Sequence, residues 1–308
     1  MTAPLILHHY DESPYAEKIR LMLGFTGLKW QSLIAPIQPP RPHLDELTGG
    51  YRRIPVAQMG ADVFCDTAII TQEIVALSGE KRLDVNAMDQ DVLALMQEAE
   101  REIFFAAIAS VSPIKLLTTL LVGMGPVGMF RFVADRVRLM KGASVRPAQG
   151  AQAKVLFAKH LDALEVRLAH QAWVTGDEPA LADFAVYHPL WLNMSCSRSG
   201  PPGGPRVRDW FERMTRIGHG HREEIDADAA WSAARNVEPR PLPAHNADSE
   251  FAVGRRVQVA PTDYGVVAVT GELACVNDER IVLRRATSAL GAVHVHFPRQ
   301  GYALSATP

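Results

Sequence analysis

The spacing of apolar residues in the first part of the chain predicts alternating strands and helices. Short apolar runs are typical of strands, whereas apolar side chains on one side of a longer run indicate a helix. Ser13 at the cap and Pro14 at the first helical position mark where the first helix begins. We therefore expect an α/β domain over residues 1–80. Its expected elements are strand 5–10, helix 14–25, strand 30–34, strands 55–58 and 63–65, and helix 67–77.

The pattern then changes to long helical periods with almost no strand signal, which predicts an all-helical domain over residues 88–235. Residues 111–133 are apolar enough to suggest a membrane span, but Lys115, Arg131 and a Gly-Met-Gly-Pro break interrupt them. We expect buried, kinked helices there and no membrane contact. The expected helices cover residues 94–110, 148–171, 182–193 and 207–217.

A third pattern follows a segment rich in proline and polar residues, at residues 236–250, which is typical of an extended linker. Beyond it, apolar and polar positions alternate between turn signals such as Asp263-Tyr264-Gly265. Four or five short strands are expected, and residues 251–308 therefore form a small all-β domain, either a barrel or a sheet.

Composition narrows the class of protein. The 308 residues are 47% apolar and 21% charged, as in ordinary soluble proteins, and a net charge of −2 argues against a nucleic-acid partner. The amino terminus lacks the pattern of a signal peptide. Three scattered cysteines are too few for a disulfide framework, so we expect a cytoplasmic protein.

Two segments of the first domain suggest a ligand site. Pro55 stands at the beginning of a strand, where it leaves main-chain groups of Ile54 free to pair with an extended ligand, although a proline there also protects a sheet edge against aggregation. Asp66 and Thr67 stand where a helix begins, and the free amides of a first helical turn attract a carboxylate. The same two residues can also cap the helix without any ligand.

Four segments, in the expected order, resemble the cytosolic glutathione transferases. The resemblance covers about residues 5–235 and implies a thioredoxin-like domain followed by an all-helical domain. It also implies a homodimer, because that family commonly pairs. The four segments are ESPYAEKIRLML (12–23), similar to the active-site loop and first helix; RRIPV (52–56), similar to the cis-proline segment; CDTAII (65–70), similar to Glu-Ser-x-x-Ile; and GDEPALADFAVY (176–187), similar to the helical folding motif.

The resemblance assigns roles within the first domain. Ser13 lies seven residues before Arg20, as in classes that use serine or cysteine to hold the glutathione thiolate, whereas Tyr10 is nearer the place used by tyrosine classes. Ser13 is our first choice, and a simple helix cap is the alternative. The remaining expected glutathione-binding residues are Ile54 and Pro55 for the peptide and Asp66 and Thr67 for the γ-glutamyl end. The glycyl carboxylate is expected to meet Arg53, with Arg52, His43 and Gln38 as further candidates, and a solvated surface side chain is the alternative for each of the four.

Two positions depart from the family pattern. Asp66-Thr67 stands in place of Glu-Ser, and the shorter Asp moves the carboxylate back by one methylene. Ala180 stands where the folding motif has a Ser or Thr cap, so Asp183 loses its reciprocal partner at the helix start.

The expected function is conjugation of the glutathione thiolate, as co-substrate, to a small hydrophobic electrophile. One alternative is a non-catalytic protein that uses the same fold for binding or as a scaffold. A glutathione-dependent thiol-disulfide reductase is a further alternative, but it needs a cysteine at position 13, and Cys65 would have to serve. The histidine pair His294 and His296 could share one face of a strand and ligate a metal, but the spacing offers no third ligand, so no metal is expected.

Overall fold

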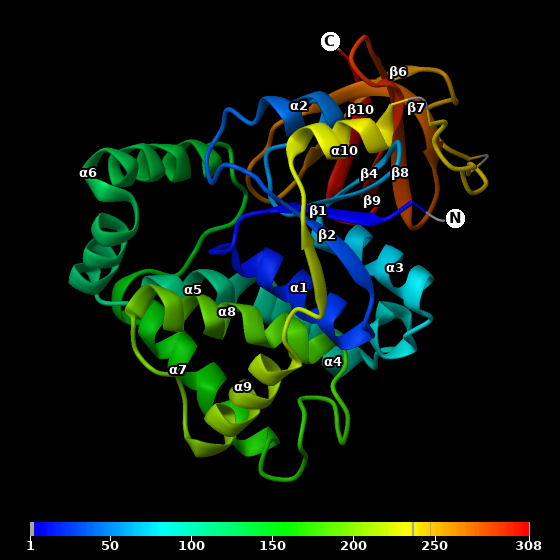
Figure 1. Ribbon diagram of the computed structural model, residues 1–308. Helices are drawn as coiled ribbons and strands as arrows, with labels where there is room; N and C mark the ends of the chain where they lie inside the picture. Colours follow the sequence, from blue (N-terminus) through cyan, green and yellow to red (C-terminus); the bar gives the residue numbers. More distant parts are fainter. Residues whose placement is uncertain (1–2, 236, 247, 308) are drawn as a thin grey trace.

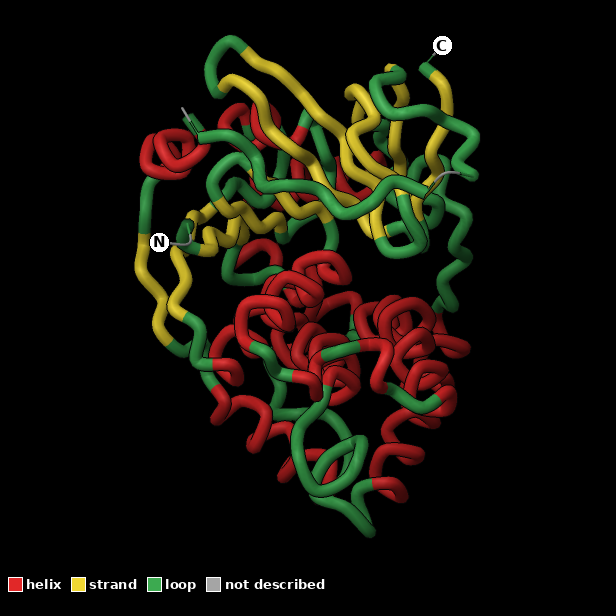
Figure 2. The backbone as a smooth tube through the Cα atoms, turned by 90° about the vertical axis from the view of Figure 1, so that its right-hand side faces the viewer, coloured by secondary structure: helices red, strands yellow, loops and turns green. Residues whose placement is uncertain are grey.

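The computed structural model describes residues 3–235, 237–246 and 248–307. Asn236 and Ala247, two positions of the predicted linker, lie outside the described residues. Helices gather at one end of the molecule and most strands at the other (Figures 1 and 2). The three expected parts, a thioredoxin-like domain, a helical domain and a C-terminal β-rich region, are all present.

The first domain has the predicted order of strands and helices. β1 pairs in parallel with β2 and antiparallel with β3, and every residue of β1 is buried because helices cover both faces of the sheet. A short helix, α2, follows the proline-rich loop and was not predicted. The elements are β1 (Leu5–His9), α1 (Pro14–Thr26), β2 (Lys29–Ile34), α2 (Pro42–Thr48), β3 (Val56–Met59), β4 (Asp62–Cys65) and α3 (Thr67–Ser78).

The second domain is helical, as expected, and is followed by a strand that the pattern did not predict. That strand, β5 (His221–Glu224), pairs in parallel with β2 at the edge of the sheet. Its sequence, His-Arg-Glu-Glu, has no apolar alternation, so only the neighbouring strand reveals it. The helices are α4 (Gln90–Glu98), α5 (Phe104–Ala109), α6 (Pro113–Leu139), α7 (Gly150–Arg167), α8 (Leu181–Ser197), α9 (Pro205–Ile217) and α10 (Ala227–Ala234). A π-helical turn (Ala99–Ile103) connects α4 to α5, and two 3₁₀ turns (Lys81–Leu83 and Val85–Ala87) lie between α3 and α4.

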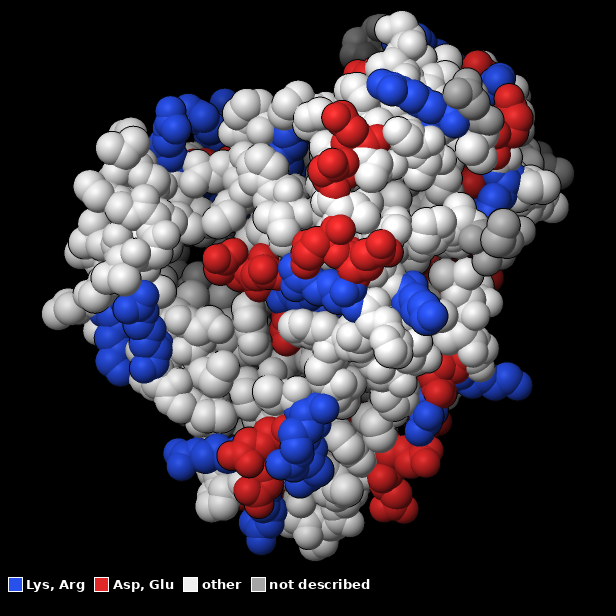
Figure 3. Space-filling view, viewed as in Figure 1, with Lys and Arg blue, Asp and Glu red and all other residues white. Residues whose placement is uncertain are grey.

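The apolar helix α6 is kinked, as predicted, but it is not buried. Gly125 has a φ of 67° and breaks the helix before Pro126. Ile114 and Phe130 are 76% and 74% exposed, and the helix projects from the body as a mostly uncharged arm at the left of Figures 1 and 3. The expectation of burial was therefore wrong. By length and composition alone, α6 is long and apolar enough to cross a membrane.

The C-terminal strands extend the first domain's sheet. β9 pairs in parallel with β4, opposite Asp62, Val63 and Phe64, and this joins all ten strands in the order β10-β6-β7-β8-β9-β4-β3-β1-β2-β5. The five strands agree with the predicted number. They are β6 (Arg256–Pro261), β7 (Val269–Val276), β8 (Arg280–Thr287), β9 (Gly291–Pro298) and β10 (Tyr302–Ala306).

Two hydrophobic cores lie on opposite sides of this sheet. Phe64 of β4 belongs to the core shared with α1, α3 and the helical domain, whereas its neighbours Val63 and Cys65 belong to the core shared with α2 and the C-terminal strands. This division follows from the alternation of side chains along a strand. The C-terminal strands thus complete a core of the first domain.

Candidate functional site

The first candidate group is Ser13, at the beginning of α1. Its Oγ accepts a hydrogen bond from the amide of Ala16 at 3.2 Å, so Ser13 caps the helix. The side chain is 1% exposed, and among the described residues its hydroxyl donates to no acceptor. Capping uses the oxygen as an acceptor and leaves the hydroxyl proton available. Tyr10, three residues earlier, accepts at its carbonyl from the Ser13 amide, and its ring packs against the C-terminal core.

The second group is the peptide bond between Ile54 and Pro55, which is cis. Both residues are buried, and Val56 begins β3 directly after them. Within residues 3–235, 237–246 and 248–307, neither the N–H nor the C=O of Ile54 forms a hydrogen bond. The main chain here has the free donor and acceptor that the sequence predicted.

The third group is the beginning of α3. Asp66 caps this helix, with its Oδ1 accepting from the amide of Ala68 at 3.0 Å, and its φ of 102° is rare outside glycine. Strained backbone of this kind tends to occur at ligand sites. Thr67 Oγ1 accepts from Lys18 Nζ at 3.0 Å, and the same ammonium contacts Glu100 at 2.6 Å. A buried cation therefore stands beside the start of α3.

C-terminal residues reach this same place. Tyr302 of β10 donates its phenolic hydrogen to Asp66 Oδ2 at 2.9 Å and contacts the hydroxyl of Tyr51 at 2.6 Å. Arg53 Nη1 lies 3.5 Å from the same Asp66 oxygen. Both carboxylate oxygens of Asp66 thus have partners within the chain.

The turn after β6 crosses the site. Arg53 Nη2 donates to the Asp263 carboxylate and to the Tyr264 carbonyl, and its guanidinium lies 4.3 Å from the centre of the Tyr264 ring. The Tyr264 hydroxyl donates to the Tyr15 hydroxyl at 3.2 Å. Tyr264 therefore spans from the cis-proline segment to the first turn of α1. Arg53, which was expected to meet a glycyl carboxylate, instead meets the carboxylate of Asp263.

The phenols at this site remain neutral hydrogen-bond donors. Burial raises the pKa of Tyr15, Tyr264 and Tyr302 above its ordinary value. The aromatic wall continues into the helical domain, where Tyr15 lies 4.6 Å from Phe104 and Tyr264 lies 5.7 Å from Phe105, measured between ring centres.

Cys65 does not have the properties of a redox cysteine. Its side chain is fully buried, and burial raises the pKa of the thiol well above its ordinary value. A reactive cysteine needs access and thiolate character, and Cys65 has neither. The reductase alternative therefore finds no support at this position.

The folding motif keeps half of its usual arrangement. Asp183 accepts hydrogen bonds from the amides of Ala180 and Val174 and from Trp210 Nε1, all at 2.8–3.0 Å. Burial nevertheless raises the pKa of Asp183 to about 6. Ala180 has no side-chain oxygen to return a bond, as the sequence predicted, but the tryptophan gives the carboxylate another partner.

One cavity, of about 640 Å³, opens within the helical domain. It is lined by residues of the junction between α5 and α6 and by residues of α7 and α8, including Val111, Phe157 and Asn193. None of its lining residues belongs to the first domain. It is therefore separate from the predicted electrophile pocket between the two domains.

Sequence reasoning missed three residues of the site: Lys18, Tyr264 and Tyr302. Lys18 carried a usable signal, because it lies one helical turn after Tyr15 and so faces the same side of α1. The two tyrosines carried none, since their place depends on how β6 and β10 join the sheet.

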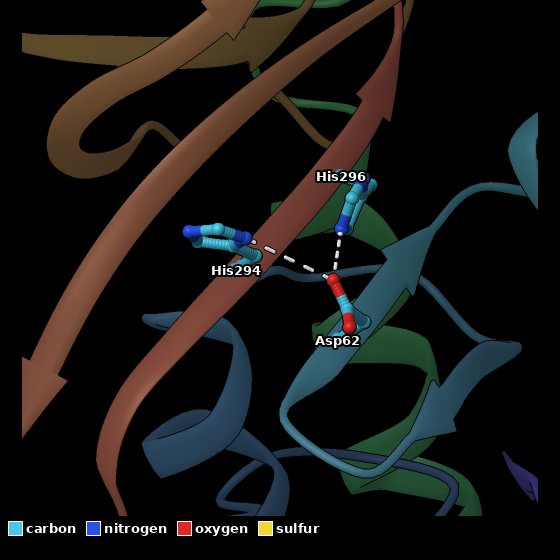
Figure 4. A group of neighbouring side chains, drawn as sticks. All are labelled: Asp62, His294 and His296. Atoms are coloured by element: carbon cyan, nitrogen blue, oxygen red, sulfur yellow. Dashed lines mark hydrogen bonds and ion pairs between the residues drawn. The ribbon is translucent and has the colours of Figure 1, made fainter. Parts of the chain in front are cut away.

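A separate polar group lies at the junction of β4 and β9. It is formed by Asp62, His294 and His296 and could hold a metal ion (Figure 4).

Comparison with known proteins places the chain in a family. Residues 7–82 match the model of the glutathione S-transferase N-terminal domain, and residues 147–213 match that of the C-terminal domain. A crystal structure of a GST-like protein from Pseudomonas syringae is 32% identical, with a TM-score of 0.75, over 98% of this chain and 99% of that one. The chain therefore belongs to the glutathione S-transferase family. This match extends over the C-terminal region of the chain as well as over the first two domains.

More distant structural matches cover a smaller share of this chain. A glutathione transferase from Methylococcus capsulatus is 16% identical over 74% of this chain and 98% of its own, with a TM-score of 0.46. A glutathione S-transferase from Pseudomonas fluorescens is 18% identical over 68% of this chain and 93% of its own, with a TM-score of 0.43. Likenesses at these scores carry no argument about this chain. A search of curated proteins finds no match.

Proposed function

We propose that the protein conjugates glutathione to a small hydrophobic electrophile, with Ser13 holding the thiolate. The observation that supports this most directly is the Ser13 hydroxyl, which has a proton to donate at the positive end of α1. A hydrogen bond to an anion contributes about 1.5–3 kcal/mol and a helix start about 0.3–1 kcal/mol. Together they can lower a thiol pKa by about two units, which requires about 2.7 kcal/mol. The thiol proton passes to solvent, so no separate base is needed. The thiolate sulfur then forms the new bond to carbon while halide leaves an aryl halide, the C–O bond of an epoxide opens, or the electron pair of an enone moves to its carbonyl oxygen.

In this proposal the tripeptide would pair with Ile54 and place its γ-glutamyl carboxylate at the start of α3. The amide of Thr67 and the ammonium of Lys18 would meet that carboxylate there. Glutathione would have to displace Tyr264, which spans the space between Arg53 and Tyr15. The unmodified protein should therefore bind glutathione weakly.

The contacts of the C-terminal residues at the site also favour one alternative, a non-catalytic binding or scaffold protein. Asp66 Oδ2 accepts from Tyr302, and Arg53 Nη2 donates to Asp263 and Tyr264, so part of the expected glutathione site is filled from within the chain. If the turn that carries Tyr264 never leaves the site, the protein would bind a partner at another surface.

Calorimetry with glutathione and conjugation rates with aryl halides, epoxides and enones separate these functions. Ser13→Ala should lower kcat/KM by about 10–150-fold, the equivalent of 1.5–3 kcal/mol. Tyr264→Ala should tighten glutathione binding about tenfold, because it removes a cation–π contact and a hydrogen bond together worth about 1.4 kcal/mol.

A second cap variant controls for lost helix stability. Asp226 caps α10, away from the site, by accepting from the Ala229 amide at 2.8 Å, so Asp226→Ala should leave the rate unchanged. An unchanged rate in Ser13→Ala removes Ser13 from the mechanism. Absence of heat at millimolar glutathione, in both the wild type and Tyr264→Ala, selects the non-catalytic function.

For assembly we propose a homodimer that pairs through the exposed face of α6. Apolar side chains on both sides of its kink are exposed, including Ile114, Val122, Val127 and Phe130. Phe130→Asp should shift the protein to monomer in analytical ultracentrifugation, whereas Val253→Asp, at a residue that is also exposed but lies in the C-terminal region, should not. A wild-type monomer that sediments with phospholipid vesicles contradicts the pairing and assigns α6 to a membrane.

We also propose a cytoplasmic location. Cys65, Cys196 and Cys275 are all free, as expected of a protein kept in a reducing compartment. Fractionation of the native cells tests this, and recovery in an oxidising compartment contradicts it.

A further inference from the structure

A cluster of one carboxylate and two imidazoles joins the C-terminal strands to the first domain. His294 and His296 lie two residues apart on β9, so they share a face, and Asp62 lies directly opposite His294 on β4. One ligand atom from each residue lies within 4.8 Å of the others, and Figure 4 shows both rings directed at the carboxylate. This carboxylate is the third ligand that the sequence spacing did not reveal.

The individual distances suit a shared ion. Asp62 Oδ1 lies 2.8 Å from His296 Nε2 and 3.9 Å from His294 Nδ1. The longer distance exceeds a hydrogen bond, and His294 Nδ1 is buried without a partner among the described residues. Two ligands on one ion, each about 2.1 Å from it, lie about 3.4 Å apart in tetrahedral geometry. The pair of distances brackets that value.

The surroundings hold the carboxylate in place. Asp62 Oδ2 accepts from the amide and the Nε of Arg240, at 2.9 and 3.3 Å, which leaves Oδ1 directed at the histidines. Glu73 accepts from both Arg240 and Arg280, so two carboxylates balance two guanidiniums nearby. Hydrogen bonds to the second oxygen of a ligating carboxylate are usual around metal sites.

One side of the cluster is open to solvent. Asp62 and His296 are almost completely buried, whereas the side chain of His294 is 13% exposed, which leaves that side for an ion and a water ligand to enter.

We propose that Asp62, His294 and His296 form a binding site for a divalent transition metal, with Zn²⁺ the best match to two nitrogen ligands and one oxygen ligand. A water molecule completes the fourth position. The ion would fasten β9 to β4 and so hold the C-terminal strands on the sheet. This site is independent of glutathione chemistry, and it revises the expectation from sequence that no metal binds.

The test uses full-length protein without a histidine tag, treated with a chelator and then dialysed. Titration with Co²⁺ should show one equivalent bound per chain, with the visible absorption of a tetrahedral site, and Zn²⁺ should displace it. His294→Ala should weaken binding at least about 100-fold, since loss of even a hydrogen-bond partner of a metal ligand costs about 10–100-fold in affinity. His221→Ala removes an exposed histidine on β5 and should leave binding unchanged.

Further measurements keep the test decisive if His294→Ala does not fold. Asp62→Asn retains the size of the side chain but loses its charge, and it should also abolish stoichiometric binding. A crystal soaked in Zn²⁺ should show an anomalous peak among the three side chains. The proposal is overturned if the wild type fails to bind Co²⁺ or Zn²⁺, or if the wild type and His294→Ala bind equally. The cluster would then serve only as a structural hydrogen bond between Asp62 and His296.

Discussion

Two of the contacts between the C-terminal region and the first domain are built differently. At the sheet edge, β9 pairs with β4 along the main chain, and buried Asp62 and His296 reinforce the pairing. At the candidate site, Tyr264 and Tyr302 reach Arg53 and Asp66 without any strand pairing. Main-chain pairing of buried strands is a permanent part of a fold, whereas side-chain contacts in a partly open site can be exchanged for those of a ligand. The edge therefore attaches the C-terminal strands, and under the proposed function the site contact would control the access of glutathione.

A pair of aspartate variants gives the most direct test of this difference. Asp62→Ala leaves His296 and Arg240 without their acceptor at a buried position, so it should lower the free energy of unfolding by about 3–5 kcal/mol. Asp66→Ala loses a helix cap and one acceptor at the site and should cost about 1–2 kcal/mol. Urea unfolding of both variants measures this, and equal losses would show that the two contacts are equivalent.

Acid should sharpen the comparison, because the first two domains hold buried neutral histidines, His8 and His9 on β1 and His160 on α7, whereas the site contact holds arginine and tyrosine. Burial lowers the pKa of His8 and His160 to about 4 and that of His9 to about 3. The unfolded chain, with histidine near pH 6.5, then binds more protons, so stability falls as the pH falls below 6.5. Asp183, with its pKa raised to about 6, gains stability over the same interval and partly offsets the loss.

From pH 7 to pH 5.5, His8, His9, His160 and Asp183 together should lower the free energy of unfolding by about 3 kcal/mol. Burial also lowers the pKa of His188 well below its ordinary value, so His188 should add to this loss, and urea unfolding at each pH measures the total. His160→Gln should remove about 1 kcal/mol of that dependence. The tightening of glutathione binding by Tyr264→Ala, in contrast, should persist at pH 5.5. A stability that does not change over this interval contradicts the neutral state of the buried histidines.

The smallest expected effect is at Tyr302. Tyr302→Phe removes the hydroxyl that donates to Asp66 and contacts Tyr51, while the ring keeps its place against Phe297. Stability should fall by about 1 kcal/mol, and glutathione should bind a few-fold more tightly because Asp66 regains a free oxygen. Calorimetry on this variant, with Tyr187→Phe in the helical domain as a control for loss of a buried phenol, checks the prediction; weaker binding would mean that Tyr302 assists the ligand.

Local signals in the sequence predicted most of the fold. Ser13 and Pro14 set the start of α1, and the apolar periods set most of the long helices, because capping and amphipathicity depend on neighbouring residues. The exposure of α6 was not predictable, since apolar content does not tell whether another surface covers a helix. β5 was missed for the related reason that an exposed polar strand has no pattern of its own.

The candidate site was predictable only in part. Ser13, Ile54 and Asp66 could be found because each lies in a segment with its own local chemistry. Tyr264 and Tyr302 could not, nor could the link between Asp62 and His296, which are 234 residues apart. Such contacts depend on which strand β9 pairs with, and nothing near Asp62 in the sequence specifies that partner.

The continuous sheet has a practical consequence for the design of shorter versions of the protein. A chain that ends at residue 250 would keep the family's two usual domains but would leave β4 with an open row of main-chain donors and acceptors. Exposed strand edges of this kind recruit other chains and aggregate. Such a fragment should be recovered mainly as insoluble material, and a soluble, monodisperse fragment would show that the first domain is complete without its last five strands.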